Sequence, residues 1–236
     1  MKPYRILKTF HFLAFVFFLS IVNAQIPSGI YFSEDENTRH ELKIDQGYLT
    51  HTVYKTDPAE FIKAVGGFFS VDDNKLRVSL EFNSAYEQDR IKNLEIPYTL
   101  AGERLNLKLD QEMVFDKREA QNQALDGQWL FATRGPDTGQ DRRGEENPRK
   151  TLKFLLDGRF QWIAYQTETM RFSGTGGGSF TAEDGVYTEN IEFFSRDNDR
   201  VGASLKFNYE IKGDDWHHTG KNSKGEPMYE IWAKRN

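Results

Sequence analysis

Apolar and polar residues alternate along most of the chain after its first 24 positions. Leu94, Ile96 and Tyr98 are apolar, and Glu95 and Pro97 stand between them. A period of two gives one apolar and one polar face, which is typical of half-buried β-strands. Proline has no N–H to donate to a β-ladder, so this strand is expected at a sheet edge or a bulge.

Eight segments of this kind follow one another in the second half of the chain. They cover residues 128–134, 151–156, 160–166, 171–180, 187–194, 202–211, 215–219 and 228–234. The connections are short and rich in Asp, Asn and Gly, as hairpin turns require. No stretch between them is long enough for a crossover helix. The pattern therefore predicts an antiparallel meander, and closure into a barrel would leave no exposed strand edge.

The strand pattern occurs twice. Residues 47–102 align with residues 158–213 at a constant offset of 111 without a gap, giving 14 identities in 56 positions, or 25 per cent. Unrelated segments of this composition would share roughly 6 per cent, so the segments are internal repeats. The identities fall mainly on glycines, aromatic residues and aliphatic residues, which are the positions that a common backbone and core would keep.

The ends of the two copies also correspond once loops of different length are allowed. Residues 29–31 match 127–129, and 114–118 match 231–235, while the second copy has 13 extra residues within 135–148. The predicted organisation is a leader over 1–24, a first repeat over 25–118, a linker over 119–126 and a second repeat over 127–236. The fold class predicted is all-β, with two tandem eight-stranded antiparallel barrels.

The first 24 residues have the composition of a secretory signal peptide. Lys2, Arg5 and Lys8 are basic, residues 10–22 are almost all apolar, and a small-residue cleavage pattern ends at Ala24. An uncleaved membrane anchor is the alternative, but thirteen residues fall short of the roughly 20 that a spanning helix needs. We expect cleavage after Ala24, a secreted or periplasmic protein and no transmembrane segment in the mature chain. Without cysteine the chain has no site for a lipoprotein anchor.

Charge and composition narrow the classes of partner. Of the 31 basic residues, 28 lie outside the leader, against 36 acidic residues, which gives the mature chain a net charge of −8. This balance argues against nucleic acid or an anionic membrane as a partner, because both need a clustered positive surface. With no cysteine, stability must come from burial, for which 19 Phe, 10 Tyr and 4 Trp provide large apolar areas.

Several motifs of the second copy resemble a known architecture. Gly127 and Trp129 in the first strand, the eight-strand meander, and Trp232 followed by Lys234 and Arg235 resemble lipocalin-type barrels. In those barrels a first-strand Trp packs under a basic residue near the chain end. The resemblance assigns structural roles to a set of residues in this copy: Gly127, Trp129, Gly176, Gly177, Gly178, Trp232 and Arg235.

A narrower resemblance covers the second copy nearly end to end. Phe160-x-Trp162, the glycine run before Phe180, residues 187–193 and the segment from Trp216 to Trp232 resemble a family of uncharacterised, secreted, lipocalin-like bacterial domains of the calycin type. The first copy departs from this pattern, because Tyr31 replaces the Trp and only two of the glycines remain. The resemblance implies a barrel that binds hydrophobic or amphipathic small molecules, and it implies no particular activity.

An eight-stranded barrel is wide enough to be filled by side chains or to hold one small ligand. The functional interpretation is an aromatic pocket in the second copy, with a carboxylate and a histidine that orient a small hydrophobic or amphipathic ligand. The residues expected in it are Trp162, Tyr165, Tyr187, Glu189, Trp216 and His218. The alternative is an interaction or scaffold protein of the cell envelope, with filled barrels and exposed aromatic residues outside them.

Other kinds of site find less support in the sequence. Glu189 is expected inward with Tyr187, Ile191 and Phe193, whereas Glu192 is an odd step away and faces outward, so the two carboxylates cannot form an acid–base pair. Likewise, His217 and His218 should point to opposite faces, which is unfavourable for a metal site.

The glycine run over residues 174–178 lacks the Lys-Ser/Thr ending of a phosphate loop and is followed by another strand. A strand that bends, or whose backbone lies close to a neighbour, is the expected role of these glycines. No nucleophile motif is present, so we expect no catalytic residues, no metal and no cofactor. Oligomeric state is left open, and the charged insertion over 135–148 is expected to be a solvated loop, or a lid over the barrel.

Overall fold

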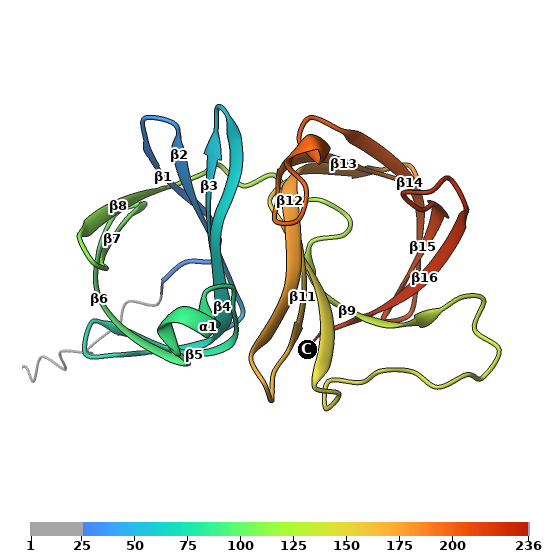
Figure 1. Cartoon of the computed structure of the whole chain (residues 1–236), viewed down its shortest axis with the longest axis horizontal. Coiled ribbons are helices and arrows are strands. Elements are labelled where there is room, and N and C mark those ends of the chain that lie inside the picture. The colour runs from blue at the N-terminus through green and yellow to red at the C-terminus, as the bar shows by residue number, and fades with distance from the viewer. Residues whose placement is uncertain (1–25, 236) are drawn as a thin grey trace, which may run out of the picture.

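The computed structural model describes residues 26–235 as two closed antiparallel β-barrels in tandem (Figure 1). The proposed signal peptide lies outside the described residues. Two closed eight-stranded barrels confirm the predicted all-β fold class, and their form is consistent with a lipocalin-like barrel. No helix of residues 26–235 is long and apolar enough to span a membrane.

Barrel 1 is built from eight strands and one short helix. The strands are β1 (Gly29–Asp35), β2 (Thr38–Asp45), β3 (Tyr48–Thr56), β4 (Ala59–Asp72), β5 (Lys75–Asn83), β6 (Asn93–Ala101), β7 (Arg104–Lys108) and β8 (Glu112–Lys117). The helix α1 (Tyr86–Asp89) lies between β5 and β6. Each strand pairs with the next, and β8 closes the barrel by pairing with β1.

Barrel 2 repeats this order. Its strands are β9 (Gly127–Arg134), β10 (Arg149–Leu156), β11 (Arg159–Gln166), β12 (Arg171–Glu183), β13 (Val186–Phe194), β14 (Ser204–Lys212), β15 (Asp215–Lys221) and β16 (Pro227–Lys234). A 3-10 turn, η1 (Asn198–Arg200), precedes β14. The eight observed strands agree with the expected ones to within three residues at either end, and β16 closes the barrel on β9.

The internal repeat is confirmed down to its irregularities. In both barrels the third and fourth strands shift register, between Val53 and Tyr54 and again between Ala164 and Tyr165. The fourth and fifth strands also shift register in both barrels, and they do so at the repeated glycine pair. The shift lies between Gly66 and Gly67 in barrel 1 and between Gly177 and Gly178 in barrel 2. Since β-bulges are specific features of a backbone, shared bulges at the same offset show shared geometry.

Pro97 does not lie at an edge, because barrel 1 has none. The pairing of β6 with β5 ends at Pro97, opposite Lys75, and its pairing with β7 begins at the next residue, Tyr98. The proline therefore stands where one ladder gives way to the other. There its missing N–H costs no regular ladder bond.

The two barrels pack side by side through the outer faces of β3, β4 and β5 and of β10 to β13 (Figure 1). Their contact is partly apolar and buries a shared set of side chains: Tyr48, Ala64, Phe82, Leu130, Leu152, Phe154, Ile163 and Tyr165. Gln161 bridges both copies at its centre, accepting from Thr50 at 3.0 Å and donating to Thr52 at 2.8 Å.

A bulge changes one inferred orientation. Simple alternation along β13 places Phe193 on the inner face with Glu189, but Glu192 has no partner in the ladder between Ile191 and Phe193. The extra residue reverses the alternation. Phe193 consequently faces barrel 1, where its ring lies 4.7 Å from that of Tyr54.

Candidate functional site

The interior of barrel 2 contains an ion pair. Lys153 of β10 donates to Glu189 of β13 at 2.9 Å, and the two side chains are 7 % and 8 % exposed. Removing two charges from water is costly unless they are well paired. The two strands lie on different parts of the barrel wall, so the pair spans its interior.

An aromatic cage surrounds the Lys153 ammonium group. Its nitrogen lies 4.8 Å from the ring centre of Trp216, 5.0 Å from Tyr187 and 5.2 Å from Trp232. Aromatic faces attract a cation at these distances, most strongly where water is excluded. The residues come from four different strands, and period-two alternation aims all of them inward. The chain's own lysine thus fills the centre of the barrel.

His218 and Glu230 lie beside this cage. Burial and the Lys153 charge lower the pKa of His218 to about 4, so the imidazole is neutral at pH 7. Its Nδ1 atom is 3.5 Å from a Glu230 carboxylate oxygen, and its buried Nε2 has no hydrogen-bond partner. Burial opposes ionisation of Glu230, but His218 and Lys153 hold the pKa of this carboxyl below its usual range.

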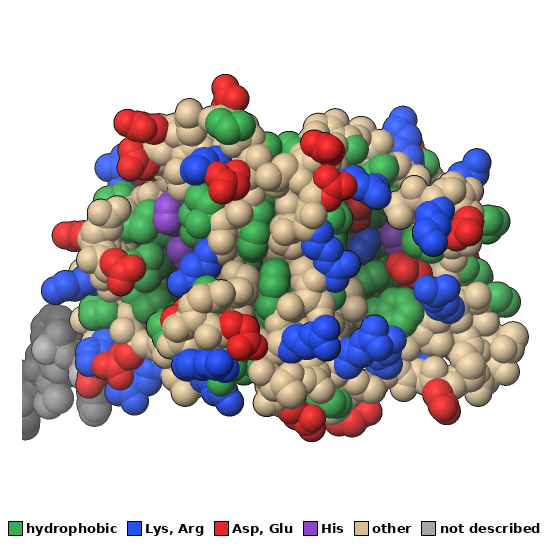
Figure 2. Space-filling model, viewed as in Figure 1, with side chains coloured by type: hydrophobic (Ala, Val, Ile, Leu, Met, Phe, Trp, Pro, Cys, Tyr) green, Lys and Arg blue, Asp and Glu red, His purple; other side chains and the backbone are tan. Residues whose placement is uncertain are grey.

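Trp216 adds a second unpartnered polar atom, because its buried indole N–H also has no hydrogen-bond partner. Buried polar atoms are nearly always hydrogen-bonded, and exceptions call for an explanation. In Figure 2 a recess in the right-hand barrel shows hydrophobic, basic, acidic and histidine atoms together. These residues form a polar, aromatic-walled floor below the mouth of barrel 2.

Barrel 1 provides an internal comparison, because the strand registers match its interior positions to those of barrel 2. The three charged residues and the histidine of the floor have apolar counterparts. Lys153, Glu189, His218 and Glu230 correspond to Leu42, Val78, Leu107 and Met113. Barrel 1 therefore forms the same closed fold with apolar residues at these positions, so the four polar residues are not required for barrel 2 to fold as a barrel.

The structure brings together four of the six expected ligand-binding residues. Tyr187, Glu189, Trp216 and His218 are all buried and meet around Lys153. Burial and nearby Glu189 raise the pKa of Tyr187 well above its usual value. The inward orientation expected for Glu189 and His218 agrees with their positions, and His217 points outward to the Tyr229 hydroxyl, 2.7 Å away.

The other two expected residues lie elsewhere. Trp162 is half-buried at the inner wall and packs edge-on against Phe194 at 5.4 Å. Tyr165 is outside the barrel, where its hydroxyl donates to Glu81 of barrel 1 at 2.8 Å. Tyr165 is three positions after Trp162, and an odd step along a strand places two side chains on opposite faces.

The residues assigned structural roles have definite positions. A Cβ on Gly176 would lie 2.7 Å from the Trp162 indole nitrogen, and one on Gly178 only 2.0 Å from the Asn190 carbonyl oxygen. The glycine run therefore permits close approach of neighbouring groups, as the sequence indicated.

Near the chain end, Lys234 and not Arg235 lies over the Trp129 ring, at 5.8 Å. Gly127 starts the strand below them, close to the Lys234 stem. Arg235 instead binds Glu81 of barrel 1 through two bonds of 2.9 Å. The basic residue that covers the first-strand Trp is thus one position earlier than the resemblance assigned.

Sequence reasoning missed Lys153 and Glu230, although a signal for Lys153 was present. The offset of 111 continues beyond residues 47–102 and sets Lys153 opposite Leu42. A lysine replacing an inward leucine, matched by Glu189 replacing Val78, indicates a buried ion pair. This pair of positions was not compared, because the gap-free alignment of the two repeats begins five residues after Leu42, at Gly47.

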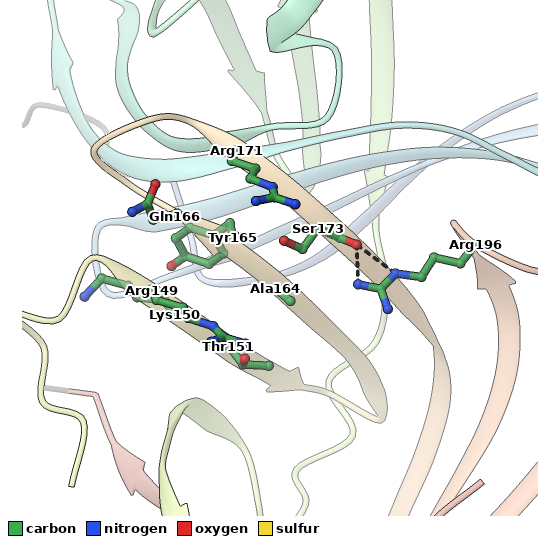
Figure 3. Close-up of a pocket in the computed structure, with 9 residues that line it drawn as sticks. All are labelled: Arg149, Lys150, Thr151, Ala164, Tyr165, Gln166, Arg171, Ser173 and Arg196. Atoms are coloured by element: carbon green, nitrogen blue, oxygen red, sulfur yellow. Dashed lines mark hydrogen bonds between the residues drawn. The ribbon is translucent and has the colours of Figure 1, made fainter. Parts of the chain in front are cut away.

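The mouth of barrel 2 holds two open pockets. One, of about 480 Å³, lies between the end of β9 and the insertion, where Arg143 covers the Phe131 ring at 4.9 Å. The insertion is anchored rather than free, since Arg142 binds Asp215 of β15 at 2.5 and 2.9 Å. The other, of about 460 Å³, is formed by β10, β11, β12 and the segment after β13 (Figure 3).

Barrel 1 carries a different pair of polar residues on its inner wall. His40 and His51 share a 3.1 Å hydrogen bond between ring nitrogens and stack at 5.3 Å. Burial, His40 and Lys63 lower the pKa of His51 to about 3. Within residues 26–235 no three His, Asp or Glu side chains gather as metal ligands would, so this pair lacks the third ligand that a zinc site requires.

Comparison with known proteins adds no assignment to this geometry. No protein-family model matches the chain, and no curated protein matches it in sequence.

Proposed function

We propose that the protein is an exported, lipocalin-like binding module whose second barrel holds a small amphipathic ligand at its mouth. The observation that carries the proposal is the exchange of four apolar residues of barrel 1 for Lys153, Glu189, His218 and Glu230 in barrel 2. A buried ion pair is weak evidence for stability, because apolar residues of similar volume are often as good or better. A costly group that one copy lacks points to function in the copy that has it.

The ligand would lie above the floor and not within it, because Lys153 already occupies the aromatic cage. Its apolar part would rest on half-buried rings at the mouth, which include Phe131 and Trp162. The unpartnered His218 Nε2 atom offers a polar contact below. A few polar groups in a mostly apolar site are typical of small-molecule pockets.

Export rests on the basic and apolar leader that ends at Ala24. The leader favours a secreted or periplasmic protein. The narrower resemblance to secreted bacterial barrels, drawn from Phe160-x-Trp162 and the glycine run, belongs to the same proposal.

A scaffold role in the cell envelope is the second candidate. The filled centre of barrel 2 favours it, because the Lys153 ammonium occupies the place of a deep ligand. In that role the open mouth would bind nothing, and the outer surface would carry the function.

Binding of the neutral fluorophore phenylnaphthylamine to the whole mature chain tests the choice. We expect saturable binding, and we expect Trp162→His, which installs the barrel 1 counterpart His51, to weaken it about tenfold. Loss of an aromatic contact worth about 1–1.5 kcal/mol gives that factor. The matched control is His51→Gln in barrel 1, which should leave the affinity unchanged.

Absence of binding to the wild-type chain, together with native mass spectra free of any copurified small molecule, would reject the binding module and favour the scaffold. Equal weakening by the two variants would place the fluorophore outside barrel 2 and would also reject the proposal.

A further inference from the structure

The pocket between β10, β11 and β12 is lined by positive charge. Arg149, Lys150, Arg171 and Arg196 contribute to it, and no acidic residue does (Figure 3). Thr151 and Ser173 add hydroxyl groups. In a chain with more acidic than basic residues, such a pocket is a local exception.

Three of these cations have no counterion. Lys150 binds Glu145 at 3.0 Å, whereas Arg149, Arg171 and Arg196 form no ion pair within the described part of the chain. Arg196 donates only to the Ser173 carbonyl, at 2.7 Å. All three are exposed side chains, so the guanidinium groups remain free to bind an anion.

A fourth arginine adds to the positive potential. Burial and the neighbouring Arg149 lower the pKa of Arg143, whose guanidinium lies over the Phe131 ring in the adjoining pocket. Like charges placed together without a counterion repel each other, and a bound anion would relieve the repulsion. Basic groups therefore line both pockets of the mouth, and Asp141 also lines the second one.

The positive charge is specific to barrel 2. The positions of Arg149, Arg171 and Arg196 are occupied in barrel 1 by Thr38, Glu60 and Ala85. There Glu60 forms an ordinary surface pair with Lys55 at 2.5 Å. The rim thus differs between the copies as the floor does, because these three positions carry arginines without an ion pair in barrel 2 and no basic residue in barrel 1.

The pocket lies next to the apolar side chains on the inner wall of barrel 2. Ala164 lines the pocket, and Trp162 follows two residues along the same face of β11. Two residues of strand span about 7 Å, which is the length of a small apolar group. A single molecule can therefore touch both places.

We propose that this pocket binds the anionic group of an amphipathic ligand, a carboxylate, sulfonate or phosphate whose apolar part lies on Trp162. Guanidinium groups suit these anions because their planar N–H donors match the paired oxygens. This inference rests on the proposed function, since it names the chemical class of the ligand in the same barrel.

Two fluorophores that differ only in their charged group separate the inference from the proposed function. Anilinonaphthalene sulfonate is phenylnaphthylamine with one sulfonate added. We expect the wild-type chain to bind the sulfonate at least tenfold more tightly, with a preference that falls as sodium chloride is raised. The salt series requires no variant and so does not depend on whether any variant folds.

The variant Arg149→Thr, Arg171→Gln, Arg196→Ala should abolish the preference and leave the affinity for phenylnaphthylamine unchanged. Its control is Lys206→Thr, Lys221→Gln, Lys224→Ala, which removes the same charge from exposed positions outside the pocket. That control should keep the preference, because the effect depends on local contacts and not on net charge.

Competition identifies the source of the anion. Dodecanoate should displace the sulfonate, and dodecanol and inorganic phosphate should not. A preference that survives the triple arginine variant, or displacement by phosphate alone, would overturn the inference while leaving the proposed function in place. Failure of both fluorophores to bind the wild-type chain would remove the proposed function and this inference with it.

Discussion

The Tyr165 hydroxyl of barrel 2 donates a hydrogen bond of 2.8 Å to Glu81 of barrel 1. The reciprocal contact also exists, because Tyr54, the counterpart of Tyr165, lies 3.5 Å from Glu192, the counterpart of Glu81. Each copy therefore offers the same tyrosine and the same glutamate to the other. A self-complementary contact of this kind is the mark of a two-fold arrangement.

Residues near the axis of such an arrangement must meet their own counterparts, and they do. Thr50 donates to Gln161, which stands 111 positions later, at 3.0 Å. Phe61 stacks on Phe172, again 111 positions later, with ring centres 6.2 Å apart. The two barrels are thus arranged as the subunits of a symmetric homodimer, joined into one chain by the linker over 119–126.

Glu81 is the first test of this interface. Besides Tyr165 it accepts from Tyr48 at 3.0 Å and binds Arg235, whose side chain is 3 % exposed. Glu81→Gln leaves that arginine buried with only Glu145 as a partner, so we expect a loss of about 3 kcal/mol in the free energy of unfolding. Urea denaturation of the whole chain measures it.

The control for Glu81 is Glu95→Gln. Glu95 pairs with Lys75 at an exposed site, where an ion pair contributes less than about 1 kcal/mol. Equal losses for the two variants would contradict a structural role for the interface network.

Glu41 gives the interface a dependence on acid. It is fully buried between the barrels with Lys43 and Arg159, which lies 2.7 Å away. Burial opposes its ionisation, but the charges of Arg159 and Lys43 have the larger effect and lower the pKa of Glu41 from 4.5 to about 2. A depressed pKa in the folded state means that the stabilisation is complete above pH 4.5.

We therefore expect the free energy of unfolding to fall as pH decreases from about 5 to 2, with about 3 kcal/mol of the loss due to Glu41. Glu41→Gln should be less stable at pH 7 and should show a flatter profile over this range. Denaturation curves recorded at several pH values for both proteins provide the measurement. Parallel profiles would show that Glu41 does not carry the acid response.

Period-two alternation predicted the strands and separates Tyr165 from Trp162 on opposite faces of β11, but it could not show that both faces are buried. The outer face of β11 is covered by barrel 1, so both faces of the strand are buried. Alternation separates the faces without saying which one contacts solvent. The interface between the barrels could not be predicted from the pattern of one strand, because it depends on how the two copies pack against each other.

For the glycine run, in contrast, the local sequence was sufficient to predict the close approach of neighbouring strands. A Cβ on Gly177 would lie 2.5 Å from the Phe193 ring and 2.6 Å from the Phe160 carbonyl oxygen. Gly66 in barrel 1 has the matching neighbours, Phe82 and the Leu49 carbonyl. Repeated glycines between aromatic strands indicated this close approach. The bulge that turns Phe193 outward had no comparable signal.

Gly177→Ala tests the close approach. The backbone oxygen of Phe160 cannot rotate away, so the strands must separate, and we expect a loss of roughly 2–3 kcal/mol in the free energy of unfolding. Ser179→Ala, two residues along β12, is the control and should change it by less than about 0.5 kcal/mol. Thermal or urea denaturation measures both, and an unchanged Gly177→Ala would show that the strands have room.

The buried pair of barrel 2 can be tested against barrel 1 residue by residue. Lys153→Leu alone leaves Glu189 without its partner, and Glu189→Val alone does the same to Lys153, so we expect each to cost about 3–5 kcal/mol. The double variant has the Leu42 and Val78 of barrel 1 at both places and should recover most or all of that loss. Urea denaturation of the four proteins gives the coupling energy between the two residues.

The same four proteins separate stability from function. If the pair serves a ligand, the double variant should be as stable as the wild type but bind phenylnaphthylamine with altered affinity, because the floor beneath the mouth has lost its charges. Full binding by a fully stable double variant would show that the pair has no part in the site. Additive losses in the double variant would instead show that Lys153 and Glu189 stabilise the barrel independently, contrary to the 2.9 Å contact between them.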